Sequence, residues 1–159
     1  MREADNNRSQ ASVLDRLIDL EPDVSREPVQ NRLSDYRQLM AVVRRDIENL
    51  LNTKNFVSVS GSRLGELENS LMTYGLPDFT AQGTNNASVR DRLRRDVETA
   101  IRRFEPRLTN VVVRIEQGSQ EERNITFRIT GLLMTDPAPE PVVFDTHLDI
   151  NKGEYEVRG

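Results

Sequence analysis

One stretch of the chain decides its fold class: VETAIRRFEPRLTNVVVRIE, residues 97–116. Before Pro106, apolar residues recur every three or four positions, which is the period of an amphipathic α-helix. After Pro106, apolar and polar residues alternate over residues 111–116, which is the period of a strand with one buried face. Because proline cannot continue a helix and disfavours the helical conformation at the residue before it, the stretch predicts a helix, a corner and a strand.

The corner carries an acid and a base on either side of the proline, Glu105 and Arg107. A carboxylate is unfavourable at a helix C-terminus, so we expect a group outside the helix to hold Glu105. Extended backbone would place the Glu105 carboxylate and the Arg107 guanidinium side by side. We interpret Glu105, Pro106 and Arg107 as a stiff docking corner for a protein partner. The alternative is an internal corner, in which the acid and the base pair with groups of the same chain.

Two long helices are expected ahead of this corner. The first begins at Ser34 and ends between Asn52 and Asn55, because apolar residues at helical spacing fill this segment and charged residues lie between them. The second begins after the capping residues 85–88 and ends at Phe104. Between the helices, residues 64–71 suggest a short helix and residues 74–79 a stiff loop packed on the core.

Strand periods continue after the corner. Residues 111–116 and 125–130 predict a hairpin around a turn at residues 117–120. A proline-rich connection leads to a third strand, whose apolar face carries Val142, Phe144, Leu148 and Ile150, and a short fourth strand carries Tyr155 and Val157. The sequence therefore predicts an α+β fold, with two main helices packed on a three- to four-stranded antiparallel sheet.

We expect the first 33 residues to form a separate polar arm ahead of the single α+β domain of residues 34–159. One short amphipathic helix is expected within this arm, with its apolar side chains at Val13, Leu14, Leu17 and Ile18. A helix this short is marginal alone, so it either docks on the core of this chain or folds against a partner. Because polar segments isolate it on both sides, we favour the partner-binding arm.

Composition narrows the function. The chain of 159 residues has no cysteine, which excludes disulfides, thiolate metal sites and a cysteine nucleophile. A net charge of −4 opposes general binding of nucleic acid, although the second helix carries a modest excess of arginines that would serve a nucleic-acid module. No segment approaches the roughly 20 apolar residues of a membrane span. We expect a cytoplasmic protein without membrane insertion.

The chain shows no clear constellation for catalysis. His147 lies between Asp145 and Asp149 at strand spacing and would allow a metal site, but a strand with one wet face places polar residues there anyway. No catalytic triad or phosphate-binding glycine loop is visible. A glycosidase would need two specific carboxylates, and the many acids single out no pair. We therefore expect no enzyme activity, no metal and no cofactor, and keep a peptidoglycan hydrolase as the alternative.

Five motifs in order carry a resemblance to a known family: SVLDRL (residues 12–17), VRRDIENLLNT (43–53), YGLPDF (74–79), FEPRL (104–108) and FDT (144–146). Together they resemble the TssE family of small baseplate wedge components of type VI secretion systems, which is similar to a wedge protein of contractile phage tails. The resemblance covers residues 12–157.

The resemblance implies a structural role rather than catalysis. Members of this family join the wedge subunits TssF and TssG in the cytoplasmic baseplate, from which the contractile sheath of the injection machine polymerises. Their Glu-Pro-Arg motif, associated with wedge contacts and sheath assembly, falls on Glu105, Pro106 and Arg107. Many members are labelled lysozyme-like, but the resemblance implies no hydrolase activity.

Overall fold

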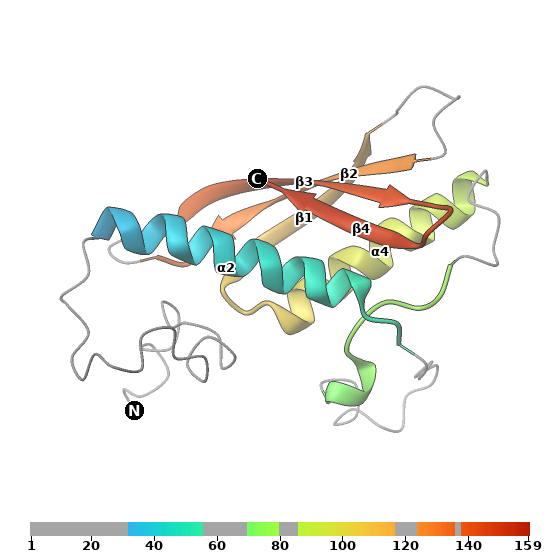
Figure 1. Cartoon of the computed structure of the whole chain (residues 1–159), viewed down its shortest axis with the longest axis horizontal. Coiled ribbons are helices and arrows are strands. Elements are labelled where there is room, and N and C mark those ends of the chain that lie inside the picture. Colours follow the sequence, from blue (N-terminus) through green and yellow to red (C-terminus); the bar gives the residue numbers. More distant parts are fainter. Residues whose placement is uncertain (1–31, 56–69, 80–85, 117–123, 136–137) are drawn as a thin grey trace.

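The computed structural model describes residues 32–55, 70–79, 86–116, 124–135 and 138–159. Two long helices pack on one face of a four-stranded antiparallel sheet with the order β1-β2-β3-β4 (Figure 1). This confirms the predicted α+β fold. The elements in chain order are α2 (Arg32–Asn52), the 3₁₀ helix η1 (Leu71–Thr73), α4 (Ala87–Phe104), β1 (Leu108–Glu116), β2 (Asn124–Leu133), β3 (Glu140–Asp149) and β4 (Glu154–Arg158).

Several predictions from the sequence fall outside the described residues. They include the amphipathic segment at Val13, Leu14, Leu17 and Ile18, the turn at residues 117–120, and most of the short helix expected at residues 64–71. The division of the chain into an arm and a domain stays a prediction.

The helices bury the faces that their apolar periods indicate. Each helix turns its apolar side chains toward the sheet and leaves charged side chains outside. The α4 helix begins at Ala87, within the predicted capping residues, and the Asn86 side chain caps it by accepting a hydrogen bond from the backbone N–H of Ser88 at 3.0 Å. The buried residues are Val43, Ile47, Leu50 and Leu51 in α2, and Leu93, Val97, Ala100 and Ile101 in α4.

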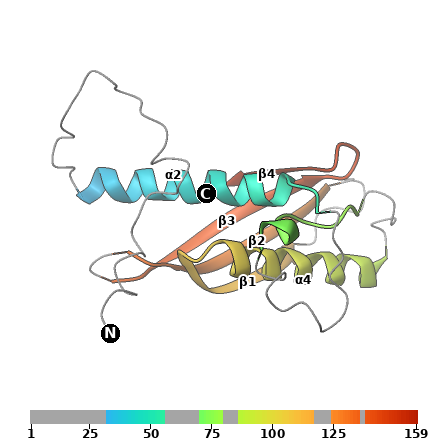
Figure 2. The same cartoon turned by 90° about the horizontal axis from the view of Figure 1, so that it is seen from below.

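The sheet has one buried face and one open face. Apolar side chains alternate onto the buried face of every strand, where Phe127 and Phe144 are fully enclosed. The α2 helix lies along β4 and α4 lies along β1, so the two helices cover opposite sides of the same face (Figure 2). The open face carries mainly polar side chains, together with the exposed Val112 and Val143.

The first strand begins earlier than its sequence period indicates. Leu108 is already buried and paired with Leu133, three positions ahead of Val111, which is also buried. Strict alternation would put these two side chains on opposite faces. A β-bulge between Thr109 and Val112, with Asn110 at φ 52°, inserts the extra residue and returns the alternation to register.

Side chains of α4 occupy the outer edge of β1. Arg102 donates from Nε and Nη2 to the carbonyl oxygen of Val111, at 3.1 and 2.6 Å. Glu98, one turn earlier on the helix, accepts a hydrogen bond from the backbone N–H of Val113 at 3.2 Å. Arg102 and Glu98 also pair with each other at 2.9 Å. Backbone groups that would otherwise pair with another strand are therefore taken.

Side chains of α2 occupy the outer edge of β4 in the same way. The Asn52 amide accepts from the backbone N–H of Tyr155 at 2.8 Å and donates to its carbonyl oxygen at 2.9 Å. Glu48, again four positions earlier on the helix, accepts from the backbone N–H of Val157 at 3.0 Å. Each helix thus covers the sheet face with apolar residues and caps one sheet edge with a polar pair.

Candidate functional site

The corner after α4 is a tight turn. Glu105 leaves the helical conformation with φ −119° and ψ 79°, as the following proline predicts. The backbone N–H of Leu108 then donates to the carbonyl oxygen of Glu105 at 3.1 Å, which closes a four-residue turn. The expectation of extended backbone at this point was wrong. Pro106 takes the second position of the turn, where its fixed φ is favourable.

Glu105 and Arg107 nevertheless lie side by side, as predicted, because the turn folds one side chain onto the other. The guanidinium donates from Nε to Oε1 and from Nη2 to Oε2 of Glu105, both at 2.6 Å. Oε1 also accepts from the backbone N–H of Arg107 at 3.3 Å. This two-pronged geometry is the strong form of an arginine–carboxylate pair. It fixes the shape of the corner.

A third charged residue, Asp46 on α2, completes the cluster. Its Oδ2 atom lies 2.6 Å from Nη2 of Arg107, and its Oδ1 atom lies 3.0 Å from Nη2 of Arg45. Sequence reasoning missed Asp46, because it is one of many acids on an amphipathic helix and no local spacing relates it to the corner. Through this contact the middle of α2 is tied to the junction between α4 and β1.

The charged side chains of the corner face inward. Glu105 is 4% exposed and Arg107 is 8% exposed, whereas Pro106 between them is exposed. The internal pairing that we considered as the alternative is therefore present in this structure. That the corner also binds a partner stays a prediction, and the surface it can offer is Pro106 with the turn around it.

Arg107 stays charged despite its burial. Burial lowers the pKa of Arg107, but the hydrogen bonds and negative charges of Glu105, and then of Asp46, outweigh this effect and leave that pKa raised. One donor, Nη1 of Arg107, is buried and has no hydrogen-bond acceptor in the part of the chain that the structure describes. The cluster also acts on Tyr74: burial raises the pKa of its hydroxyl, and the negative charges of Asp46 and Glu105 raise that pKa further.

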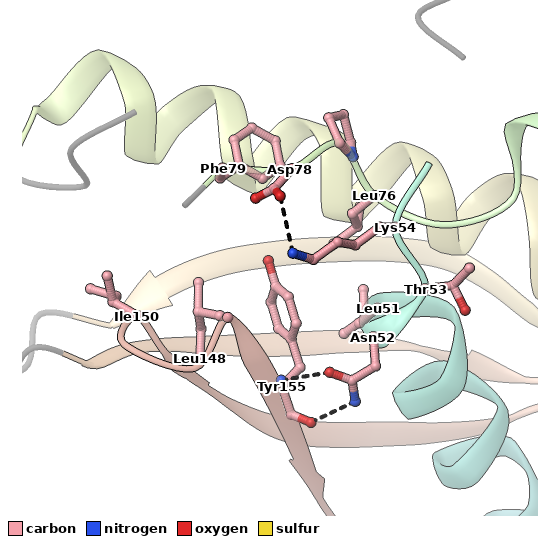
Figure 3. A pocket seen from close by; sticks show the side chains of 12 residues that line it. Leu51, Asn52, Thr53, Lys54, Leu76, Asp78, Phe79, Leu148, Ile150 and Tyr155 are labelled. Carbon is pink, nitrogen blue, oxygen red and sulfur yellow. Dashed lines mark hydrogen bonds and ion pairs between the residues drawn. The ribbon is translucent and has the colours of Figure 1, made fainter. Parts of the chain in front are cut away.

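A hollow lies at the C-terminal end of α2, between the loop of residues 76–79 and the β3–β4 turn (Figure 3). Apolar side chains and the Tyr155 ring line most of it, and Lys54 pairs with Asp78 at 3.0 Å on its rim. Among the described residues that line it, Asp78 is the only carboxylate. These residues therefore offer no pair of carboxylates, which a glycosidase mechanism needs.

The polar residues around His147 each have a separate partner. Nδ1 of His147 lies 3.2 Å from Oγ1 of Thr126, and Asp145 accepts from Arg128 at 3.0 Å. Asp149 accepts from two backbone N–H groups of the β3–β4 turn. Over the described ranges no three acidic, histidine or cysteine side chains converge to hold a metal ion.

Neither long helix that the structure describes is apolar enough over its length to cross a membrane.

Comparison with known proteins adds a family match. The family model described as baseplate wedge protein gp25 matches residues 37–138. The fold is similar to a chain in a solved structure described as the baseplate complex from the type VI secretion system. That similarity has a TM-score of 0.50 and 19% identity, over 72% of this chain and 97% of the other. A search of curated proteins finds no significant match.

Proposed function

Because the family match spans more than half of the sequence, this chain belongs to the gp25 baseplate wedge protein family, and on that premise we propose that it serves a type VI secretion system. In this proposal the chain is a structural subunit that joins the wedge subunits TssF and TssG and supports assembly of the contractile sheath. The match over residues 37–138 carries the proposal, since it includes most of α2, all of α4, the corner, and strands β1 and β2.

The corner is the contact that we propose for these partners. Glu105 and Arg107 act from inside, by holding the turn in one shape through their double hydrogen bond. Pro106 is exposed at the tip of that turn and meets the partner directly. A contact surface that is rigid before binding loses little conformational entropy when the partner arrives. We propose a second contact at the candidate arm, with Val13, Leu14, Leu17 and Ile18. These four residues lie outside the described part of the chain.

The proposal is tested by capture of a co-purified complex of TssF and TssG on the immobilised full-length chain. Pro106→Glu adds a negative charge at the tip of the corner, and we expect it to weaken capture by about tenfold or more, equivalent to ~1.4 kcal/mol. Asn151→Glu is the matched control, because it adds the same charge to an exposed residue of the turn at the far end of the sheet.

A wild-type chain that does not capture the complex would refute the baseplate role. Capture by Pro106→Glu at wild-type strength would refute the corner as the contact and leave the baseplate role standing. Thermal unfolding of both variants checks that each remains folded.

A further inference from the structure

Two adjacent apolar side chains, Leu71 and Met72, are the most exposed large hydrophobic residues that the structure describes. Leu71 is 85% exposed and Met72 is 60% exposed. Both belong to η1, whose third residue, Thr73, is buried and anchors the turn. The fold of this chain makes little use of either side chain, so their exposure calls for another explanation.

Hydrogen bonds hold the backbone beneath this apolar pair. The Ser70 side chain caps η1 by accepting from the backbone N–H of Met72 at 3.3 Å, and Thr73 donates from Oγ1 to the carbonyl oxygen of Ser70 at 3.0 Å. Asn55, at the end of the segment after α2, donates from Nδ2 to the carbonyl oxygen of Thr73 at 2.9 Å. Leu71 and Met72 are thus presented in a fixed position.

The apolar pair and the corner are linked by a ring contact. Tyr74, which follows η1, packs edge-on against Phe104 with ring centroids 5.2 Å apart. Phe104 is the last residue of α4, immediately before the corner. In Figure 1 the green turn of η1 and the yellow loop after α4 both lie on the side of the helices away from the sheet. The ring contact therefore brings η1 close to the end of α4 that leads into the corner.

We propose that Leu71 and Met72 are an apolar anchor that inserts into an apolar groove on a neighbouring baseplate subunit, beside the contact made by Pro106. The proposal rests on the baseplate role and adds a second, chemically different contact to it. Large apolar side chains held in place near the centre of an interface commonly supply much of its binding energy. The flexible thioether of Met72 suits an irregular groove.

A second copy of this chain is a poorer occupant. A stable dimer buries about 800 Å² on each partner, far more than two side chains on one short turn can supply. Copies of a chain with a net charge of −4 also repel each other. The anchor fits a larger partner, whose groove receives the pair while Pro106 and its neighbours extend the contact.

The test compares two double variants in the capture assay with the co-purified wedge subunits. Leu71→Ser with Met72→Ser removes the anchor. Val112→Ser with Val143→Ser is the matched control, because it removes two exposed apolar residues from the open sheet face. We expect the first variant to weaken capture by about tenfold or more, since burying one such side chain is worth that much in affinity, and the second to leave capture unchanged.

A third variant checks the chemistry of the groove. Exchanging the two residues, as Leu71→Met with Met72→Leu, keeps the apolar surface and is expected to retain capture within about threefold, as volume-conserving apolar exchanges usually do. All three variants are expected to unfold at the wild-type temperature, because the substituted side chains are exposed.

The outcomes separate this inference from the baseplate role. Wild-type capture by Leu71→Ser with Met72→Ser, while Pro106→Glu is weakened, would overturn the anchor alone. Equal losses in the anchor variant and in the control on the open face would also overturn it. A wild-type chain that dimerises in sedimentation, with the dimer lost in the anchor variant, would assign the pair to a second copy instead. Failure of the wild-type chain to bind wedge subunits would refute the baseplate role itself.

Discussion

Asp46 and Arg107 are 61 positions apart in the sequence, and their side chains meet at 2.6 Å. The contact joins the middle of α2 to the turn between α4 and β1, so a single guanidinium connects three elements. Because the same guanidinium also binds Glu105 with two hydrogen bonds, its removal would leave the buried Glu105 carboxylate without an ion-pair partner and would leave Asp46 with Arg45 alone.

We therefore predict that Arg107→Ala strongly destabilises the fold. Breaking a buried pair by removing one partner costs about 3–5 kcal/mol, which is a large share of the stability of a typical domain. Urea denaturation followed by circular dichroism measures this loss. Asp78→Ala is the control, because its pair with Lys54 is about half exposed and should cost no more than about 1 kcal/mol. Equal losses in the two variants would contradict the structural role of Arg107.

Removing the polar side chains that cap the edge of β1 is expected to make the protein self-associate. Glu98→Ala with Arg102→Ala frees the carbonyl oxygen of Val111 and the N–H of Val113 for pairing with another strand. We expect this double variant to self-associate as its concentration rises, with a loss of about 1 kcal/mol in stability at most. Analytical ultracentrifugation measures the association.

The control for the edge experiment is another ion pair of α4, Asp91 with Arg95. These two side chains lie 3.1 Å apart on the exposed side of the helix. Their replacement by alanine removes a similar pair of charges and leaves the caps of β1 in place. A double variant at Glu98 and Arg102 that stays monomeric, as this control should, would show that the caps are not needed to block the edge.

Periodicity predicted the elements of this fold because each one follows a single repeating rule. The helix from Ser34, which in fact begins at Arg32, and the strands after Pro106 keep one apolar face along their length. The bulge at Asn110 was not predicted, since a single residue in a left-handed conformation leaves almost no trace in a hydrophobic period. The alternation of apolar residues shows which side chains after the bulge are buried. It does not show at which residue the bulge lies.

The candidate site was only partly predictable for a different reason. Proline chemistry indicated the corner and the neighbouring positions of Glu105 and Arg107. Which way these side chains point depends on Asp46, which comes from a distant element. The caps from Glu48 and Asn52 were missed for the same reason, because an acid or an amide on a helix looks like any solvated residue until the strand edge is placed beside it.

Removing the charge of Asp96 is expected to stabilise the fold by an amount that depends on pH. Its Oδ2 atom is buried without a hydrogen-bond partner among the described residues, and burial raises its pKa above the ordinary 3.8, although Arg92 and Arg95 act in the opposite direction. A carboxyl with a raised folded-state pKa favours the fold fully below its unfolded pKa. This contribution is lost as the pH rises through the folded-state pKa.

At pH 7 the charged Asp96 is therefore a cost. We expect Asp96→Asn to raise the free energy of unfolding by less than about 1 kcal/mol, because the side chain is 32% exposed and the exchange also removes its ion pair with Arg92 at 3.8 Å. The difference between variant and wild type should shrink as the pH falls through the raised folded-state pKa of Asp96, because the carboxyl of the wild type then becomes neutral too. Denaturation at several pH values measures it. Asp91→Asn, at an exposed and paired position, should show no gain. A gain in Asp96→Asn that is the same at every pH would rule out the charge as its cause.

A methyl group added at Gly75 is expected to lower the stability of the fold strongly. Its φ of 103° lies in the region that residues with a side chain rarely adopt, and a Cβ there would collide with the carbonyl oxygen of Thr53. That carbonyl cannot withdraw, because it accepts from the backbone N–H of Leu76 at 2.9 Å, and Leu76 is buried in the core. Gly75→Ala should therefore displace the loop as well as strain the backbone.

We expect Gly75→Ala to lower the free energy of unfolding by about 2 kcal/mol or more, since it combines backbone strain with a steric clash. Gly153→Asn is the comparison, because φ 68° at Gly153 lies in the left-handed region that asparagine tolerates. Its cost should stay below about 1 kcal/mol. Urea denaturation of both variants measures the difference. Because the displaced loop leads from η1 to Phe79 in the core, Gly75→Ala should also weaken capture of wedge subunits through Leu71 and Met72, whereas Gly153→Asn should not. Similar stability losses in the two variants would mean that the packing of Gly75 against Thr53 is not what holds this loop.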